Sequence, residues 1–173
     1  MSKKDFTWKD AVPSVFAFFL FIMQIIYGIF FSKNPTITII SYIGIGIFIL
    51  SGIFGMTPVI VFPKKGGAGK GKNFVYTKKI VTTGIYSIVR HPQYSSFILW
   101  AFGSIFLFQN LVIIILGIPI ILLTYYDMTR EDKRNIKKFG KSYEEYMKKV
   151  PRANFLLGII LVIYRKYSKE NKT

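Results

Sequence analysis

Two short segments hold the residues best suited to chemistry. The first contains Arg90 and His91, which stand directly before Pro92 at the start of an apolar run. Proline is favoured at the first position of a helix, where its missing N–H costs nothing, so we expect both basic side chains at a helix entrance. The free N–H groups and the dipole at such an entrance favour negative charge. The segment therefore predicts a site for a carboxylate or a phosphate.

The second segment contains the acidic pair Glu131-Asp132. Helical spacing places Asp132 on an apolar face with Met128 and Ile136, whereas Glu131 lies about 100° around the helix. An unpaired carboxylate on an apolar face near a membrane is costly and needs a partner. Arg90 or Lys133 could supply that partner for structure alone. Alternatively, the acids and Arg90 together suit a zwitterion that carries a carboxylate and an ammonium group.

Composition excludes several other kinds of site. The chain has no Cys and a single His, so disulfides, thiolate catalysis and multi-histidine metal centres are excluded, and we predict no metal. The formal net charge of +16 is combined with 51% hydrophobic residues. This combination argues against a nucleic-acid-binding protein, so we expect no nucleic-acid partner.

Uncharged runs of helical length define the elements that must position these residues. Runs 11–31 and 37–62 are each long enough to cross the ~30 Å core of a bilayer, and run 94–126 is broken by Gln109-Asn110 into 94–108 and 111–126. We therefore predict an all-α integral membrane bundle of about four transmembrane helices, two full spans and a shorter hairpin. A single domain, 1–173, is expected.

Basic residues lie between and after these runs. Residues 63–93 carry a net +7, 127–154 carry +4, and 164–173 carry +3. The positive-inside rule places these segments, and both termini, on the cytoplasmic side. The last apolar run, Phe155 to Tyr164, is short and flanked by basic segments, so it is expected to lie in the membrane interface. Arg90 has an alternative interpretation as an interfacial anchor that sets the topology and binds no ligand.

Local signals refine two of these elements. Ser41, Gly44, Ser51 and Gly55 form a stripe of small residues that predicts close helix packing. Gly140 is expected to end a helix that continues out of the fourth span, and Ser142 with Glu145 predicts a capping box for a short helix after it.

The motifs together resemble those of a known superfamily. The pattern TTGxYxxVRHPxY over Thr82–Tyr94, an apolar helical hairpin, the pair Glu131-Asp132, and FGxxYxxYxxxVPR ending at Arg152 resemble the isoprenylcysteine carboxyl methyltransferase and phospholipid methyltransferase superfamily. The resemblance covers roughly residues 75–155, and the first two spans match only in hydropathy.

This resemblance implies an integral membrane methyltransferase that uses S-adenosylmethionine on a lipophilic substrate admitted from the bilayer. The segments 75–94 and 127–154 would be its cytoplasmic catalytic parts. The cofactor-binding residues carried over are Tyr86, His91, Pro92, Tyr94 and Glu131, and the catalytic residues are Glu131, Asp132 and Arg90. The acceptor is left open among an isoprenylcysteine-type carboxylate, a phospholipid amine and a thiol, as is the oligomeric state.

Departures from the family pattern leave two alternatives. Ile85, Ser96, Asp127 and Asp132 stand where the family often has Pro, Gly, Arg and Glu, which leaves the substrate undecided. Membrane sterol reductases, which use NADPH, have a similar RHPNY-type segment that usually continues with Gly-Glu rather than Ser95-Ser96. The other alternative is a non-catalytic membrane scaffold or lipid-binding protein.

Overall fold

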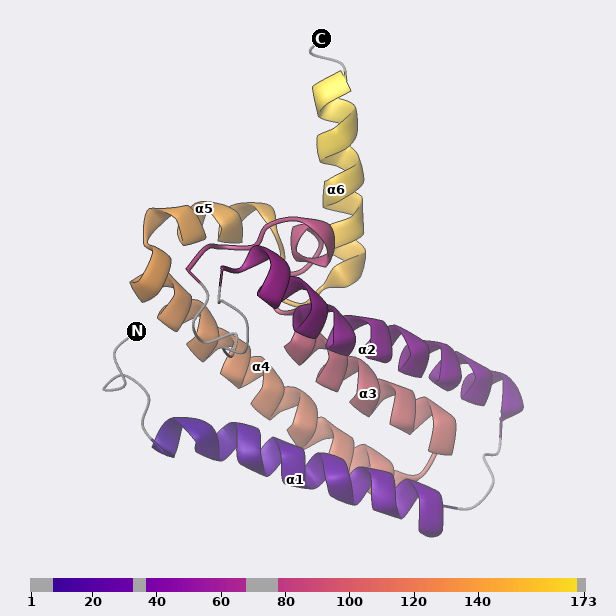
Figure 1. The fold of residues 1–173 in the computed structure, drawn as a ribbon. Coiled ribbons are helices and arrows are strands. Elements are labelled where there is room, and N and C mark those ends of the chain that lie inside the picture. The colour runs from indigo at the N-terminus through magenta and orange to yellow at the C-terminus, as the bar shows by residue number, and fades with distance from the viewer. Residues whose placement is uncertain (1–7, 33–36, 68–77, 171–173) are drawn as a thin grey trace. The chain divides into compact units, whose positions relative to one another are not determined.

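A computed structural model describes residues 8–32, 37–67 and 78–170, and every regular element in these ranges is helical. The predicted all-α class is confirmed. In chain order the elements are α1 (Trp8–Phe30), α2 (Thr38–Lys65), the 3₁₀ turn η3 (Gly84–Ser87), α3 (Pro92–Phe108), α4 (Leu111–Phe139), α5 (Lys141–Lys149) and α6 (Phe155–Glu170) (Figure 1).

The chain divides into two compact units. The first comprises Met1–Gly55 and Tyr94–Arg130, and the second comprises Met56–Gln93 and Glu131–Thr173. Helices α2 and α4 each begin in the first unit and end in the second. A single domain over the whole chain therefore stays a prediction.

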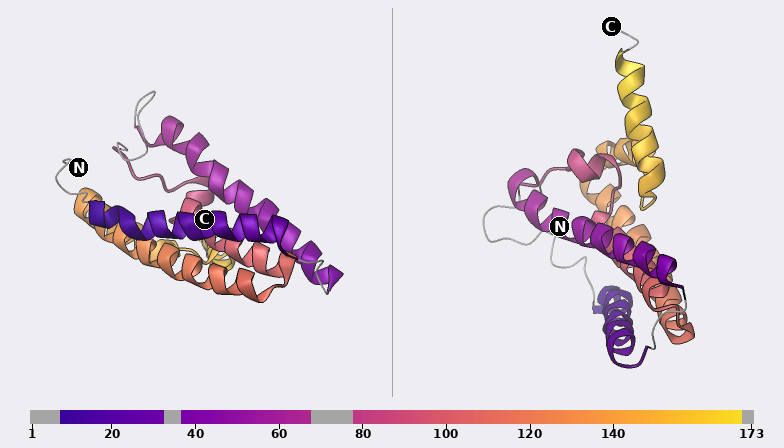
Figure 2. Two further views of the ribbon diagram at one scale, coloured as in Figure 1. Left: turned by 90° about the horizontal axis from the view of Figure 1, so that it is seen from below. Right: turned by 90° about the vertical axis from the view of Figure 1, so that its right-hand side faces the viewer.

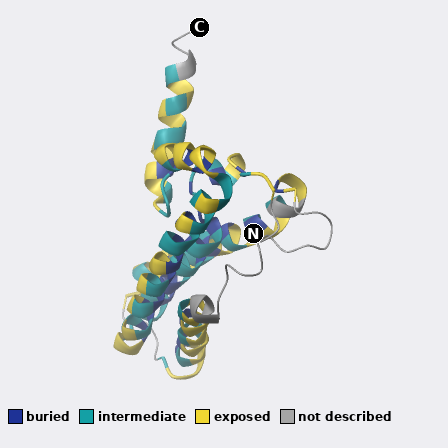
Figure 3. Ribbon diagram, turned by 90° about the vertical axis from the view of Figure 1, so that its left-hand side faces the viewer, coloured by how far each residue is buried: buried dark blue, intermediate teal, exposed yellow. Residues whose placement is uncertain are grey.

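Three of the described helices are long and apolar enough to cross a membrane. They are Val12–Phe30, Thr38–Val61 and Leu111–Phe139, which agree with the apolar runs in the sequence. Their large apolar side chains are mostly exposed (Figure 3), as expected where lipid is the solvent. Helix α3 forms the predicted hairpin with α4 but has only 17 residues, so the fourth crossing stays a prediction.

Small residues bring α2 against α3 in the first unit. A Cβ added at Gly44 would lie 2.6 Å from the Leu107 backbone nitrogen and 2.9 Å from the Gly103 carbonyl oxygen. The Ser51 hydroxyl donates to the Ser96 carbonyl oxygen at 2.8 Å. In lipid, where apolar burial gives little drive for helix association, such close backbone approach supplies the packing. The predicted packing stripe is confirmed.

A glutamine closes the other end of the hairpin. Gln109, between α3 and α4, has a φ of 48°, in the left-handed region that is strained for a residue with a side chain. Its amide accepts from the Ile37 N–H at 3.0 Å and donates to the Ile37 carbonyl at 2.7 Å and to the Ser41 hydroxyl at 3.0 Å. These bonds fix the backbone just before α2.

Helix α1 joins the same unit through polar and aromatic contacts. The fully buried Gln24 donates to the Ile113 carbonyl of α4 at 3.0 Å. Phe21 packs against Trp100 of α3, with ring centroids 4.9 Å apart. The Ser14 hydroxyl donates to Asp127 of α4, so Asp127 has a structural partner in this unit.

Replacing Gly44 by Ala tests the α2–α3 contact. The new methyl group would overlap backbone atoms that cannot rotate away, so we expect a loss of about 2 kcal/mol, or roughly 4–8 °C in the unfolding midpoint in detergent. Gly46→Ala on the same helix is the matched control, because a Cβ there meets nothing within 4 Å. Similar midpoints for the two variants would contradict the contact.

Candidate active site

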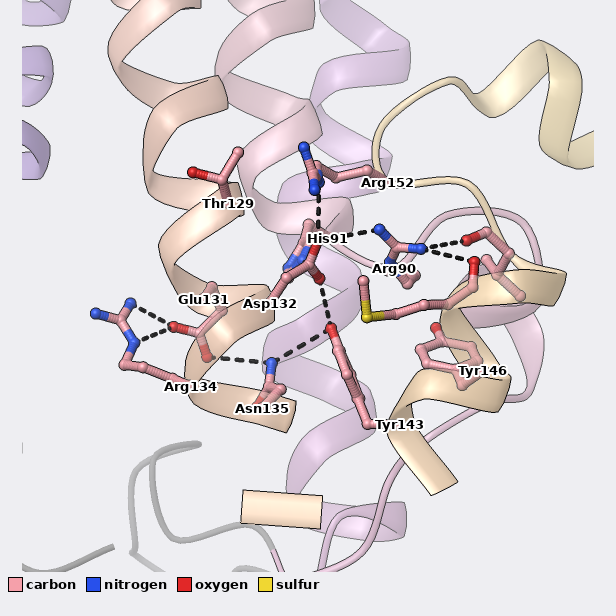
Figure 4. A network of polar contacts seen from close by, with 12 residues as sticks. Arg90, His91, Thr129, Glu131, Asp132, Arg134, Asn135, Tyr143, Tyr146 and Arg152 are labelled. Carbon is pink, nitrogen blue, oxygen red and sulfur yellow. Dashed lines mark hydrogen bonds and ion pairs between the residues drawn. The ribbon is translucent and has the colours of Figure 1, made fainter. Parts of the chain in front are cut away.

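The buried carboxylate of Asp132 is the centre of the candidate site. It accepts hydrogen bonds from Arg90 Nη2 at 3.0 Å, His91 Nε2 at 2.7 Å, the Tyr143 hydroxyl at 2.8 Å and Arg152 Nε at 2.8 Å. All five residues belong to the second unit, and Figure 4 shows the donors converging on this carboxylate. Each carboxylate oxygen receives two of these four contacts, so the buried charge is well compensated.

Backbone pairing holds the basic side chains beside the acid. The Arg90 N–H donates to the Pro151 carbonyl at 3.0 Å and the His91 N–H to the Arg152 carbonyl at 3.3 Å. The segment after α5 therefore lies along the segment before α3. Pro92 begins α3 as predicted, and its buried ring completes this turn into the helix.

Arg90 also binds the end of α5. Its Nη1 donates to the carbonyl oxygens of Met147 and Val150, both at 2.9 Å. The last carbonyls of a helix lack intrahelical partners, and a cation there also suits the negative end of the dipole. Its Nε is buried without a hydrogen-bond partner among the described residues. Arg90 thus joins α4 to α5 and retains one unused donor.

Helix α5 contributes tyrosines rather than charges. Tyr143, Tyr146 and Val150 form a buried core, against which Ile80 and Ile136 pack. The helix begins at Lys141 after Gly140, which has a φ of 58° and ends α4 as predicted. The predicted capping box is wrong, because Gly140 is the residue at the N-cap and no side chain caps the helix.

The buried phenols of this region keep their protons. Burial raises the pKa of Tyr86, Tyr143 and Tyr146 above the ordinary value, and the neighbouring Asp132 charge raises that of Tyr143 further. The neutral Tyr143 hydroxyl can therefore donate to Asp132, and that of Tyr146 donates to the Tyr86 carbonyl at 2.6 Å. These bonds attach α5 both to α4 and to η3.

Glu131 lies in a different environment from its neighbour Asp132. It is half-buried and paired with Arg134, whose Nε donates to it at 2.9 Å. Asn135 lies within 3.4 Å of both Glu131 and the Tyr143 hydroxyl, so a chain of polar contacts connects the two acids. The rotation of about 100° between consecutive helix positions separates them.

The structure brings together three of the predicted site residues: Arg90, His91 and Asp132. Tyr86 and Pro92 are buried in the same unit, whereas Tyr94 belongs to the first unit. Of the segment 75–94, residues 75–77 lie outside the described residues.

Tyr143 and Arg152, which both donate to Asp132, belong to the FGxxYxxYxxxVPR motif, but the sequence analysis gave neither of them a role. The requirement that a buried carboxylate be paired was the available signal, and of the two partners that it suggested, Arg90 and Lys133, the structure pairs Arg90 with Asp132. It could not identify donors 11 and 20 residues further along the chain, because their approach depends on how α5 folds back.

The cluster carries more positive than negative charge. Arg90 and Arg152 face the single carboxylate of Asp132, so one positive charge is left over even with His91 neutral. The Arg152 side chain is 26% exposed. An anionic group is therefore the complementary ligand. Among residues 8–32, 37–67 and 78–170, acidic and histidine side chains do not come together in any group of three or more that could hold a metal ion.

These features define a helical membrane protein with a buried ionic site in its second unit. Residues 72–137 match the model of the isoprenylcysteine carboxyl methyltransferase family. The match includes Arg90, His91, Glu131 and Asp132 and ends before α5. The predicted resemblance is confirmed, and this part of the chain is similar to this family.

Individual relatives cover limited parts of the chain. A protein-S-isoprenylcysteine O-methyltransferase of Schizosaccharomyces pombe is 42% identical over 74 residues, which are 42% of this chain and 31% of the relative. Protein-S-isoprenylcysteine O-methyltransferase B of Arabidopsis thaliana is 29% identical over 110 residues, 57% of this chain and 56% of the relative. The human protein-S-isoprenylcysteine O-methyltransferase is 32% identical over 76 residues, 43% of this chain and 27% of the relative.

The chain thus spans between 27% and 56% of the length of these relatives. No solved structure gives a match of comparable significance.

Removing the Asp132 charge should strongly destabilise the second unit. In Asp132→Asn, the two arginines and His91 lose their common anion, and breaking a buried ion pair costs about 3–5 kcal/mol. Glu131→Gln is the matched control, since the partly exposed pair with Arg134 should contribute about 1 kcal/mol or less. Denaturant unfolding in detergent would measure both, and equal losses would contradict the central role of Asp132.

Alkaline pH should weaken the fold through the buried tyrosines. An unfolded phenol ionises near pH ~10, whereas Tyr86, Tyr143 and Tyr146 keep their protons when folded. Their contribution to stability is therefore complete below about pH 10 and falls above it, by up to about 1.4 kcal/mol per pH unit for each group. Tyr143→Phe should reduce this slope, measured by unfolding from about pH 8 to about pH 11. Tyr164→Phe, at an exposed position, is the control. A larger reduction of the slope in Tyr164→Phe than in Tyr143→Phe would refute the assignment.

Proposed function

We propose that the protein is an integral membrane methyltransferase that uses S-adenosylmethionine and acts on a lipophilic substrate. The observation that carries the proposal is the position of Arg90 and His91 on Asp132 within the segment that matches the family. The names of the relatives support an isoprenylcysteine-type acceptor. The apolar helices favour access from the bilayer.

The residues of the second unit fit this cofactor. S-adenosylmethionine supplies an electrophilic methyl group on a sulfonium and carries a carboxylate and an ammonium group at its methionine end. The surplus positive charge of Arg90 and Arg152, and the unused Nε donor of Arg90, suit the carboxylate. The half-buried Glu131 suits the ammonium group by charge.

In this proposal the predicted residues have different roles. Arg90 and Glu131 contact the bound molecules. Asp132 positions Arg90 and His91, because its two oxygens accept hydrogen bonds from both of them as well as from Tyr143 and Arg152. Tyr86 and Pro92, both buried, shape the wall of the site. The cofactor-binding role of Tyr94 rests on the sequence motif alone.

The proposed reaction needs no nucleophilic side chain. Methyl transfer from a sulfonium is an in-line displacement with a neutral leaving group, so positioning the two reactants contributes most of the rate. A carboxylate or thiolate acceptor requires no base. An amine or hydroxyl acceptor would transfer a proton to Glu131 or His91 if either came within hydrogen-bond reach.

The proposed location follows from the charge distribution. Basic segments 63–93 and 127–154 and both termini would lie on the cytoplasmic side. The site lies in the second unit with residues 63–93 and 131–154 of these segments. It would therefore draw its cofactor from the cytoplasm and its acceptor from the adjoining leaflet.

Ligand binding by the full chain in detergent tests the cofactor. Calorimetry should detect S-adenosylmethionine and S-adenosylhomocysteine, and His91→Ala should weaken binding by roughly tenfold or more, about 1.4 kcal/mol. Lys133→Ala is the control, because it removes one exposed positive charge from the same helix as Asp132 and should change affinity less than twofold. Binding of NADPH in place of both sulfur compounds would favour the reductase alternative, and binding of none would favour a scaffold.

Transfer of a labelled methyl group then identifies the acceptor. Prenylcysteines, aminophospholipids and small lipophilic thiols should be supplied in the same vesicles. A product with prenylcysteine is the expected result. Cofactor binding without any product would refute the enzymatic part of the proposal.

A further inference from the structure

Helix α6 has a continuous apolar face that the described protein does not cover. Its exposed large apolar residues are Leu156, Leu157, Ile159, Ile160, Ile163, Tyr164 and Tyr167. At about 100° per residue these positions form one stripe about 160° wide. Figure 1 and the right-hand view of Figure 2 show the C-terminal part of the helix extending away from α5, and exposed residues follow its length in Figure 3.

The opposite face of α6 is attached to the segment that leads to the ionic cluster. Gly158 is buried, and a Cβ added there would overlap the backbone carbonyl of Ile88. Further along the helix, Arg165 Nη2 donates to the Ser87 carbonyl at 3.1 Å. Ser87 and Ile88 stand just before Arg90. One face of α6 therefore contacts the segment that leads to Arg90, and none of the described residues covers its opposite face.

Charge and residue order indicate what covers the exposed face. Residues 155–164 contain no charge, whereas Arg165, Lys166, Lys169 and Lys172 against Glu170 leave a net +3 in 164–173. Tyr164 and Tyr167 lie at the change from apolar to basic, and tyrosine is enriched at the headgroup level of membranes. This order matches the boundary between acyl chains and anionic headgroups. Three helices of the same chain are long and apolar enough to cross a bilayer, so lipid is an available partner.

We infer that the exposed face of α6 binds the acyl–headgroup boundary of an anionic bilayer, and that this contact holds the η3 segment in place ahead of Arg90. The membrane would thus be a structural partner of the ionic cluster. This inference does not depend on the proposed methyl transfer, because it concerns the position of α6 and the order of residues 84–91.

Depth-dependent quenching tests the lipid contact. The chain has no Cys, so a single introduced thiol can carry an environment-sensitive fluorophore without other changes. Ile160→Cys should be quenched strongly by nitroxide-labelled acyl chains in phosphatidylcholine–phosphatidylglycerol vesicles, as should Ile49→Cys on the exposed face of α2. Glu144→Cys, exposed on α5, should be quenched several-fold less by lipid and more by aqueous iodide.

Two outcomes would overturn the lipid contact. Quenching of Ile160→Cys by iodide and not by lipid would place α6 in water. Protection from both quenchers, together with disulfide cross-linking of Ile160→Cys between chains, would mean that a second copy covers the face.

Hydrogen exchange tests the link to the η3 segment. Replacing Ile160 and Ile163 by Ser should weaken the lipid contact and increase exchange of residues 84–91 several-fold in the same vesicles. Replacing Ile45 and Ile49 of α2 by Ser, also exposed, is the control and should leave that exchange unchanged. Unchanged exchange in the α6 variant would refute the link.

Discussion

A buried carboxylate cannot be left uncompensated, and the second unit is arranged around this requirement at Asp132. Donors reach it from the segment before α3, from α5 and from the segment after α5. Moving a charge out of water costs several kcal/mol, which only well-placed partners offset. The position of α5, the path of residues 150–152 and the entrance of α3 therefore depend on one another, because all of them meet the same acid.

The first unit is held together by different physics. Its helices approach through glycine and serine, as at Gly44 and Ser51, and by aromatic contacts such as Phe21 with Trp100. Close packing and a few buried hydrogen bonds replace the hydrophobic drive that lipid removes. Thus one chain combines a lipid-adapted packing unit with an ionic unit, and α2 and α4 pass through both.

Features encoded by nearby residues were predictable from sequence. The apolar runs predicted the helices, and Gly140 predicted the end of α4. The cost of an unpaired Asp132 predicted a basic partner, either Arg90 or Lys133, and the structure has Arg90. Ser142 was misread because a side-chain capping pattern is local and weak, whereas Gly140 already occupied the N-cap with a positive φ. Tyr143 and Arg152 could not be assigned, since their convergence is set by how α5 turns back. Helix α6 continues past the predicted apolar run to Glu170, because polar residues can extend a helix that has already formed.

The amide of Gln109 pairs with the backbone at Ile37, which precedes it by 72 residues. A growing chain exposes Ile37 long before Gln109 is synthesised. The start of α2 therefore has to wait for a partner that arrives only with the hairpin. The hydrogen bonds that hold the backbone at Ile37 therefore form only after the turn between α3 and α4 has been synthesised.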